Sequence, residues 1–295
     1  MIIRETHRVT QEFVGLRLQE YAPQVLTLLP TRSGVKKALK RQEILIDGKP
    51  ATSARIMQEG MTLELLEGES ISSRIYRIDL PILFEDEYLA IINKPAGIPV
   101  SGNQFKTIQN SLVGVLSPST QEDALPIPLP VHRLDALTSG LLVIAKTGQA
   151  RRALGTIFEE RKVQKFYQAI VIGETKDKGD MNFPIEGKES LSSYTRISTT
   201  PSLKSGTLTL LELKPHTGRT HQLRIHCAQA GFPIAGDIVY GDKEHTILHK
   251  GLFLIATKIT LPHPISEEEI SLEITLPKKF ERYLSGEKKR FEKWG

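Results

Sequence analysis

The sequence predicts an α+β fold, with a main domain built on a mostly antiparallel mixed β-sheet and a small α/β domain before it. Short apolar runs typical of strands recur from residue 141 onward, at 141–145, 167–172, 208–213, 252–256 and 270–275. Helical patterns are few, and the clearest covers 151–161. The chain has 295 residues, of which 39% are hydrophobic, and this length allows one medium-sized domain and one small one.

The N-terminal residues form the predicted small domain. A helix is expected over 32–41, beginning at Thr31 or Ser33, followed by a strand at 44–46, a tight turn and a second strand near 62–65. Three of the helix's cations are four residues apart and share one face, which would suit a phosphate backbone. A solvated helix face explains the same charges equally well. The five cations of this helix are Arg32, Lys36, Lys37, Lys40 and Arg41.

A polar stretch separates the two predicted domains. Residues 67–75 are small, charged or polar and fit a linker. We therefore expect a small domain at 1–67, a linker at 68–79 and a main domain at 80–295. The main domain begins with two short apolar runs, and a turn fixed by Pro95 and Gly97 ends them.

Composition narrows the function classes. The net charge is +5, which permits a polyanionic partner. The only cysteine is Cys227, so no intrachain disulfide and no cysteine-based zinc site can form. The first residues lack the apolar core of a signal peptide, and no apolar run is long enough to span a bilayer. We expect a cytoplasmic protein with no membrane association.

The segment 132–140 holds the most informative residue, Asp135. Its carboxylate stands before the apolar run 141–145, which reads as a buried strand after a Thr-Ser-Gly turn. A charge at the mouth of a buried strand is costly without a partner, and Arg133 and Arg224 are the candidates. A structural ion pair or a turn-capping role would explain an arbitrary aspartate in this position.

Other chemistries fit the residues poorly. Three histidines recur every five residues, but this spacing makes them diverge in a strand or a helix, so a metal site is not expected. Ser139, His132 and Asp135 crowd one turn and lack the nucleophile elbow of a catalytic triad. Neither a dinucleotide fingerprint nor a phosphate loop is present. One carboxylate with several arginines and no cofactor site favours an isomerisation or a covalent group transfer.

A second dense motif occupies 215–226. If 220–226 is a strand, Leu223 and Ile225 share a face and could form the apolar wall of a pocket, with His221 on the same side. Gln222, Arg224 and His226 would face the other way, and Arg219 would lie near the rim of the turn.

These motifs occur together with others in a fixed order. They are His-Arg-Leu-Asp-x-x-Thr-Ser-Gly at 132–140, Lys165-x-Tyr167, Gly218 to His226, Gly231-x-Pro233-Ile234-x-Gly236-Asp237, Tyr240-Gly241 and, upstream, Lys94-Pro95-x-Gly97. In this the chain resembles the RluA-type pseudouridine synthases along nearly its whole length. It departs from the common pattern at Ala136-Leu137, Ser101 and Ile255. The N-terminal residues resemble the small RNA-binding domain of ribosomal protein S-four.

The resemblance implies a function and a set of roles. The family isomerises specific uridines to pseudouridine in structured RNA, so the implied partner is rRNA, tRNA or both, and no cofactor or metal is needed. It implies a central cleft in which Asp135 is the nucleophile and Arg224 is its salt-bridge partner. Tyr167 would pack on a flipped-out base, while Arg133 would insert into the vacated stack. The other implied site residues are Leu223 and Ile225 in the base pocket and, as RNA contacts, Arg219 and the five cations of the N-terminal helix.

Three functions remain open from the sequence alone. The first is a pseudouridine synthase that acts as a monomer and needs no protein partner. The second is a non-catalytic RNA-binding or ribosome-assembly protein that retains the synthase fold. The third, an aspartate-dependent glycosidase, fits less well because a second carboxylate is not evident beside Asp135. The charged C-terminal residues, Lys288 to Lys293, fit a solvated terminus.

Overall fold

The structure is a computed structural model that describes residues 3–66, 75–241 and 250–295. The chain divides into two compact units, 1–74 and 75–295. Much of the predicted linker, residues 68–74, lies outside the described residues, and 75–79 contain neither helix nor strand.

The N-terminal unit packs two helices on one small sheet. Four strands pair in the order β1-β4-β2-β3, and every pairing is antiparallel. The buried side chains include Leu18 and Tyr21 from the first helix, Val35 from the second and Leu63 from the sheet. The elements are β1 (Ile3–Arg8), a 3-10 turn (Gln11–Phe13), α1 (Leu18–Val25), α2 (Arg32–Lys40), β2 (Ile44–Ile46), β3 (Lys49–Pro50) and β4 (Thr62–Leu66).

The sequence predicted α2 and the turn that follows β2. Thr31 caps α2, since its hydroxyl accepts a hydrogen bond from the Gly34 amide at 3.1 Å. Asp47 and Gly48 both have positive φ angles, of 51° and 74°, as a tight hairpin of the primed type requires. The Asp47 carboxylate also accepts from the Thr62 amide at 2.8 Å, which ties the turn to β4.

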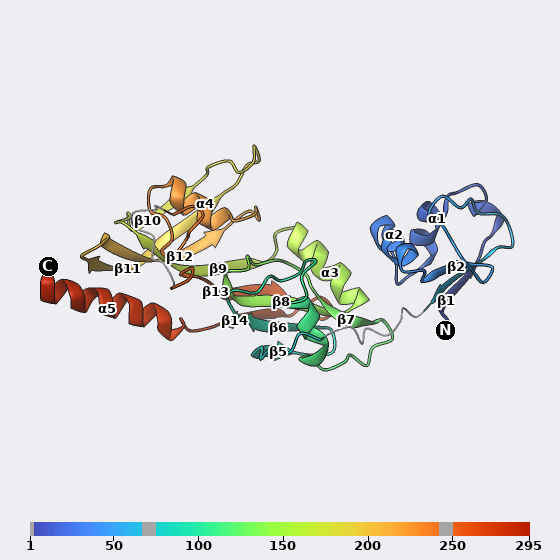
Figure 1. Cartoon of the computed structure of the whole chain (residues 1–295), viewed down its shortest axis with the longest axis horizontal. Helices are drawn as coiled ribbons and strands as arrows, with labels where there is room; N and C mark the ends of the chain where they lie inside the picture. The colour runs from blue at the N-terminus through green and yellow to red at the C-terminus, as the bar shows by residue number, and fades with distance from the viewer. Residues whose placement is uncertain (1–2, 67–74, 242–249) are drawn as a thin grey trace. The chain divides into compact units, whose positions relative to one another are not determined.

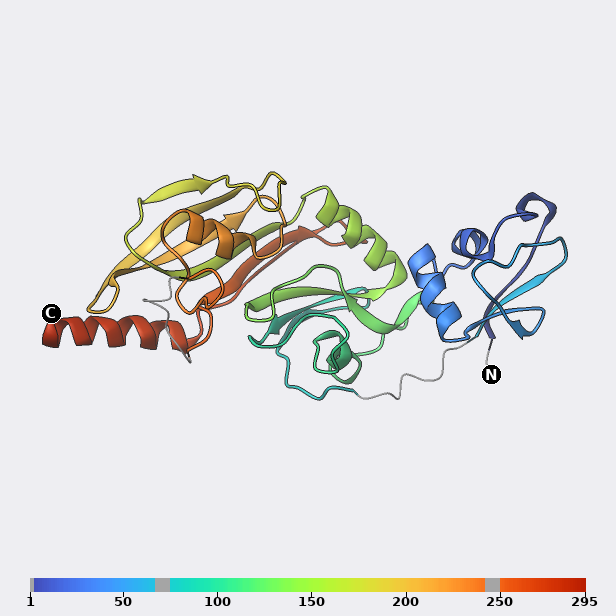
Figure 2. The same ribbon diagram turned by 45° about the horizontal axis from the view of Figure 1, so that its top comes forward.

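The second unit is built on one large sheet. Its strands follow the order β10-β11-β12-β9-β13-β8-β6-β5, with β14 beside β13 and β7 beside β8. All described pairings are antiparallel except the short one between β8 and β13, so the predicted mostly antiparallel mixed sheet is confirmed. The long strands β9 and β13 connect the two halves of the sheet (Figure 2).

The strands of this sheet are β5 (Ile82–Glu85), β6 (Leu89–Lys94), β7 (Ala124–Pro130), β8 (Ser139–Thr147), β9 (Gln164–Ile172), β10 (Lys178–Met181), β11 (Ser192–Ser202), β12 (Gly206–Pro215), β13 (Leu254–Pro262) and β14 (Glu269–Glu273). Its helices are a 3-10 helix (Gln109–Gly114), α3 (Gly148–Glu159), α4 (Gln222–Gln229) and α5 (Lys278–Trp294).

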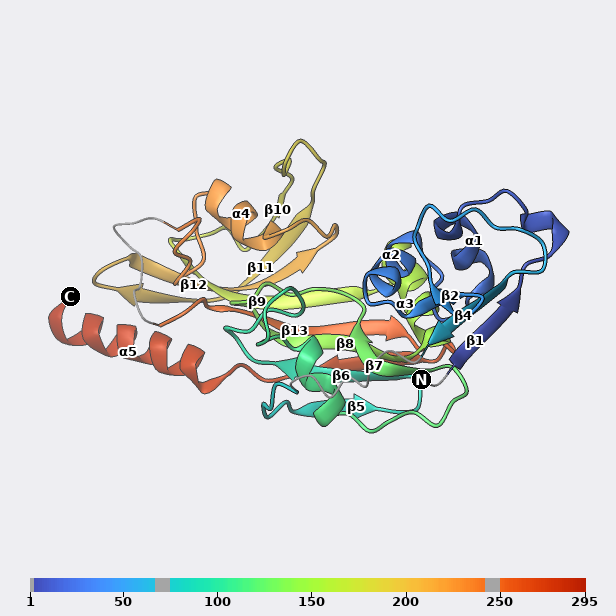
Figure 3. The same ribbon diagram turned by 45° about the vertical axis from the view of Figure 1, so that its right-hand side comes forward.

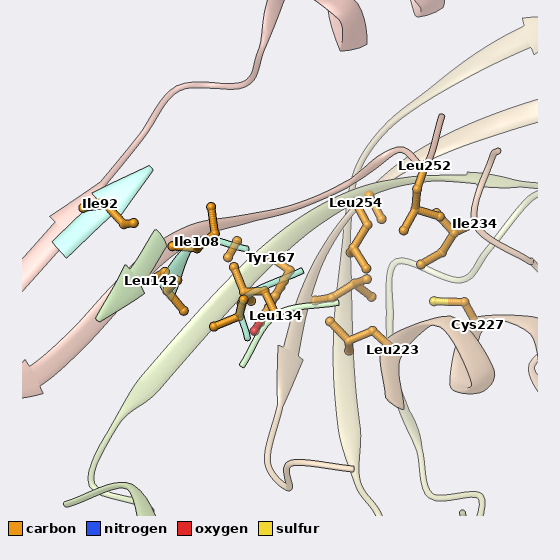
Figure 4. Packing of buried hydrophobic residues seen from close by; sticks show 14 of the residues in the cluster. Ile92, Ile108, Leu134, Leu142, Tyr167, Leu223, Cys227, Ile234, Leu252 and Leu254 are labelled. Carbon is orange, nitrogen blue, oxygen red and sulfur yellow. The ribbon is translucent and has the colours of Figure 1, made fainter. Parts of the chain in front are cut away.

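Two helices cover opposite faces of the β9-β12-β13 part of the sheet (Figures 1 and 3). On one face, Leu223 and Cys227 of α4 join Tyr167, Leu134 and Leu254 in the largest hydrophobic cluster (Figure 4). On the other face, Phe280 and Tyr283 of α5 pack against Phe253 and Ile170. Helix α4 therefore lies on the same face as Tyr167.

The start of β8 lies unusually close to β13. Gly140 has φ +112°, and a Cβ atom at this position would lie 2.2 Å from the carbonyl oxygen of Ala256. Only glycine can occupy such a place without displacing one strand. The glycine of the 132–140 motif thus fixes where the loop that carries Asp135 meets the sheet.

The structure corrects one expectation about secondary structure. Residues 222–229 form helix α4, whereas a strand was predicted over 220–226. Apolar residues at 223, 225 and 227 alternate as they would in a strand. In the structure, five of the first six α4 residues are buried, so the helix is enclosed on several sides and its sequence lacks the usual amphipathic pattern. The charged C-terminal residues were expected to be solvated, and Lys288, Lys289, Arg290 and Lys293 are indeed exposed, on the helix α5, which packs on the sheet through Phe280 and Tyr283.

Within the described residues, none of the helices has the length and apolar composition needed to cross a membrane.

Candidate active site

The main cavity of the second unit opens around Asp135. Its volume is about 830 Å³, and Tyr167, His221, Leu223 and Arg224 line it together with the Asp135 loop. Strand β9, the start of α4 and the loop before β8 thus supply side chains to one place, although they lie far apart in the sequence.

Hydrogen bonds to its backbone carbonyls hold the Asp135 loop in place. The Thr138 amide donates to the Asp135 carbonyl at 3.1 Å, and the Gly97 amide donates to the Ala136 carbonyl at 2.7 Å. The buried Lys94 ammonium donates to the carbonyls of Ala136 and Pro95 at 3.1 and 2.8 Å. The Lys94-Pro95-x-Gly97 motif is therefore the clamp for the loop that presents Asp135.

Burial changes the pKa of Lys94. Desolvation lowers the pKa of its ammonium to about 8, although the nearby Asp135 carboxylate acts in the opposite direction. At neutral pH the clamp still carries its positive charge beneath the loop.

His132 anchors the other end of the loop. Its Nε2 accepts a hydrogen bond from the Val143 amide at 3.0 Å, and its ring stacks on Phe158 at 4.8 Å. Burial, together with the charge of Lys165, lowers the pKa of His132 to about 3. A neutral imidazole held in this way is a structural anchor for the loop.

Arg224 lies beside Asp135, but its strongest partner is a different carboxylate. Its Nε and Nη2 donate to the two oxygens of Asp237 at 2.7 and 2.8 Å, whereas Nη1 lies 3.6 Å from Asp135 Oδ2. The Tyr240 ring covers the guanidinium at 5.0 Å. The geometry thus places Arg224 as predicted and adds Asp237 and Tyr240 as the residues that hold it.

Asp237 is suited to this task. Burial alone would raise its pKa, but hydrogen bonds from Arg224 and from the amides of Tyr240 and Val239 keep the pKa of Asp237 below its ordinary value. The sequence offered Asp237 only as part of a motif, with no role, because its partner lies 13 residues away on α4.

Asp135 has a second neighbour that the sequence did not single out. His221 Nε2 lies 3.8 Å from Asp135 Oδ1, and His221 Nδ1 lies 2.9 Å from the Tyr240 hydroxyl. The two carboxylate oxygens of Asp135 therefore face different side chains, Arg224 on one and His221 on the other. In the predicted strand, His221 and Arg224 would have pointed to opposite faces, so the error in secondary structure concealed this pair.

Tyr167 enters the cavity from β9 and is 8% exposed. Burial, with a further contribution from the Asp135 carboxylate, raises the pKa of its hydroxyl well above the ordinary value. The phenol is therefore neutral in the physiological range and offers the cavity an aromatic surface.

The two residues predicted to form an apolar wall differ in position. Leu223 lines the cavity, but Ile225 does not. In a strand the two would share a face, whereas in helix α4 they are rotated by about 200° from each other. Helical geometry thus explains why only Leu223 reaches the site.

The predicted RNA-contacting arginines lie at the rim. Arg133 is exposed, and among the described residues it has no carboxylate within salt-bridge distance. Arg219 is also exposed, and its Nε donates to the Glu189 carbonyl at 3.2 Å. Arg161, Lys165 and Lys214 line the same cavity, so the mouth is cationic.

The five predicted cations belong to the N-terminal unit and are all exposed. Four of them lie on α2, and Arg41 directly follows it. Arg41 is bound by Glu43 at 2.6 Å, and Arg32 lies 3.9 Å from Glu20. Lys36, Lys37 and Lys40 make no ion pair with any described residue.

The recurring histidines do not converge. His216 bonds to Ser193, and His226 bonds to Ser190 and Ser192, while His221 turns toward Tyr240. Across the described residues, no cluster of three potential ligands could hold a metal ion. Cys227 is fully buried in the core, and burial raises the pKa of its thiol above the ordinary value.

Comparisons with known proteins identify the family. The family model described as "RNA pseudouridylate synthase" matches residues 88–229. An RNA pseudouridine synthase of Aquifex aeolicus is 33% identical over 283 residues, covering 86% of this chain and 89% of the relative. The ribosomal large subunit pseudouridine synthase D of Nitrosomonas europaea is 31% identical, covering 91% of this chain and 83% of that protein.

Solved structures give the same result. Human RNA pseudouridylate synthase domain containing 4 is 27% identical, with a TM-score of 0.56 over 70% of this chain and 92% of that one. Human RNA pseudouridylate synthase domain containing 1 is 25% identical, with the same TM-score, over 68% and 84% of the two chains. The fold and these relatives show a pseudouridine synthase. The chain belongs to the RluA family of RNA pseudouridine synthases.

Proposed function

We propose that this enzyme isomerises specific uridines in structured RNA to pseudouridine, with Asp135 as the nucleophile, and that large-subunit ribosomal RNA is its substrate. The observation that carries the chemical part is the position of Asp135, a carboxylate in a cavity whose oxygens face Arg224 and His221. The names of relatives from Nitrosomonas europaea and Rickettsia bellii support the substrate, since both are called ribosomal large subunit pseudouridine synthases.

The reaction breaks the bond between N1 of uracil and C1′ of the ribose and forms a bond from C5 to C1′. The proton on C5 leaves and N1 gains one, so the nucleotide keeps its composition and no cofactor is consumed. Asp135 attacks either the anomeric carbon or C6 of the base, and each requires an ionised carboxylate. The Arg224 guanidinium lies 3.6 Å from this carboxylate and provides a neighbouring positive charge.

The substrate uridine must leave its stack before it can reach Asp135, at a cost of a few kcal/mol. Arg133 is exposed beside the nucleophile loop and is suited to fill the vacated place with its planar guanidinium. Tyr167 offers an aromatic face to the flipped base, and Leu223 closes the cavity on the α4 side.

The N-terminal unit has the composition of an RNA anchor. It carries exposed lysines on α2 beside a small sheet, and we propose that it is a domain like that of ribosomal protein S-four, joined to the catalytic domain by the stretch 68–79. Its cations would contact phosphates and so add affinity without reading sequence.

The test is conversion of unmodified large-subunit ribosomal RNA in vitro. Wild-type protein is expected to produce pseudouridine at discrete positions, and Asp135→Asn, which keeps the shape of the side chain but not the nucleophile, is expected to lose the activity by several orders of magnitude. Transfer RNA provides the parallel substrate. A non-catalytic RNA-binding protein would bind both RNAs and modify neither.

A further inference from the structure

The proposed reaction needs a proton acceptor as well as a nucleophile. When C5 bonds to C1′, it still carries its hydrogen, and the product forms only after a base removes that proton. Because the overall reaction is an isomerisation, the base must then release the proton, either to N1 or to solvent. General bases of this kind are typically histidine or carboxylate side chains within reach of the reacting carbon.

The surroundings of Asp135 contain one suitable group. In the described part of the chain, two basic side chains lie within 4.0 Å of its carboxylate, Arg224 and His221. A guanidinium does not give up its proton in proteins, so Arg224 cannot accept one. Tyr167 is neutral because burial raises the pKa of its hydroxyl, and the Nε2 of His132 is already engaged by the Val143 amide.

His221 is held as a proton acceptor would be. When its Nδ1–H donates to the Tyr240 oxygen, Nε2 is the unprotonated nitrogen and points toward Asp135. Nε2 makes no hydrogen bond to any described residue, and the side chain, which lines the cavity, is 31% exposed. The nitrogen is therefore accessible to a substrate that binds against Asp135.

The backbone of His221 is also unusual. Its φ and ψ angles are 54° and 22°, in the left-handed region that few residues other than glycine, asparagine and aspartate adopt. Such conformations persist where the surrounding structure enforces them, and they concentrate at functional sites. Here the conformation begins helix α4 and directs the imidazole into the cavity.

A single segment supports both neighbours of Asp135. Asp237 holds Arg224 with two hydrogen bonds and accepts from the Tyr240 amide at 3.1 Å, while the Tyr240 hydroxyl holds His221. The segment 237–240 thus positions a cation and an imidazole on either side of one carboxylate.

We propose that His221 is the catalytic base that removes the C5 proton after the carbon–carbon bond has formed. This inference rests on the proposed function. The C5–H electron pair returns to the uracil ring, the proton passes to Nε2, and the imidazolium then releases it to N1 or to water, which restores the neutral histidine. Tyr240 is the positioning residue: when its hydroxyl oxygen accepts from Nδ1–H, Nε2 is left unprotonated for this step.

The inference separates two steps that a fluorinated substrate can distinguish. In 5-fluorouridine, fluorine replaces the hydrogen on C5, so bond cleavage and C–C bond formation need no C5 base. A variant without the base should therefore fail on uridine and still consume 5-fluorouridine. Large-subunit ribosomal RNA transcripts made with uridine tritiated at C5, or with 5-fluorouridine, provide the two substrates.

The variant is His221→Asn. Asparagine tolerates the left-handed backbone, and its amide can still bond to Tyr240, but it has no basic nitrogen at the position of Nε2. Tritium release from uridine RNA is expected to fall about 100-fold or more, as for loss of a general base. Consumption of 5-fluorouridine, measured by nucleoside mass spectrometry, should stay close to the wild-type rate.

Two further variants control the result. Tyr240→Phe keeps the ring over Arg224 but frees Nδ1, and a smaller loss confined to the uridine RNA is expected. His216→Gln changes another histidine of the cavity, and it should leave the ratio of the two rates at its wild-type value.

The inference is overturned if His221→Asn slows both substrates equally or neither. If wild-type protein converts neither RNA, the proposed function falls, and the inference falls with it. The activity of the wild-type protein therefore distinguishes the two failures.

Discussion

Replacing Asp237 with asparagine should expose how much of the site depends on one buried carboxylate. The Asp237 side chain is 1% exposed and the Arg224 side chain 3%, and two hydrogen bonds of 2.7 and 2.8 Å join them. The substitution keeps the shape but removes the charge, so Arg224 is left buried with only the more distant Asp135. Breaking a buried pair in this way costs about 3–5 kcal/mol.

This magnitude can be measured by thermal unfolding. For a unit of this size, 1 kcal/mol corresponds to roughly 2–4 °C in Tm, so a fall of about 6–20 °C is expected. The depressed pKa of Asp237 adds a pH dependence. Its stabilisation is present at neutral pH and is lost as the pH falls through the pKa of the folded state, so Asp237→Asn should flatten the acid limb of the wild-type curve.

A double-mutant cycle with Arg224→Met supplies the control. The double variant has no buried cation without a partner. Its loss of stability should therefore be smaller than the sum of the losses in the two single variants. Additive losses, or a cost for Asp237→Asn below about 1 kcal/mol, would refute the view that this pair holds Arg224 in place.

Three more outcomes follow from the structure. Because the pKa of Lys94 is lowered to about 8, the unfolded chain binds more protons than the folded one between about pH 8 and 10.5, and stability should rise over this range by about 3 kcal/mol relative to Lys94→Met. If the free energy of unfolding, measured at several pH values, falls over this range relative to Lys94→Met, the prediction is wrong. Gly140→Ala should lower Tm sharply or prevent folding, because its Cβ would lie 2.2 Å from the Ala256 oxygen. The control Gly155→Ala, in an open helical position, should raise stability by about 0.5–1 kcal/mol. Equal effects of the two substitutions would count against the close approach of β8 and β13. Replacing Lys36, Lys37 and Lys40 together with alanine should reduce the slope of log affinity against log salt for RNA by about two to three, and an unchanged slope in filter binding would exclude them as phosphate contacts.

Much of the fold could be predicted from local pattern. The apolar runs at 141–145 and 208–213 lie in strands β8 and β12, and the cap at Thr31 and the positive φ angles at Asp47 and Gly48 match the expected helix start and turn. These features depend on residues close together in sequence. The strand β11 and the helix α5 carry mixed polar patterns, and their burial comes from contacts with distant residues.

The site was predictable in part for the same reason. Asp135, Arg224 and Tyr167 meet in one cavity, as the motifs implied. The strand predicted at 220–226 reversed the relation between His221 and Arg224, and it placed Ile225 beside Leu223. Asp237 and Tyr240 could not be assigned, because their roles depend on hydrogen bonds to α4 that no local pattern encodes.

The central claim is that this RNA pseudouridine synthase acts on ribosomal RNA through Asp135. Its most direct test is a map of pseudouridines in large-subunit ribosomal RNA from cells that lack the gene, complemented with wild type or with Asp135→Asn at equal protein levels. We expect one or more positions to be lost on deletion, restored by wild type and absent with Asp135→Asn. Full restoration by Asp135→Asn would contradict the role of this carboxylate, and an unchanged map on deletion would contradict the substrate.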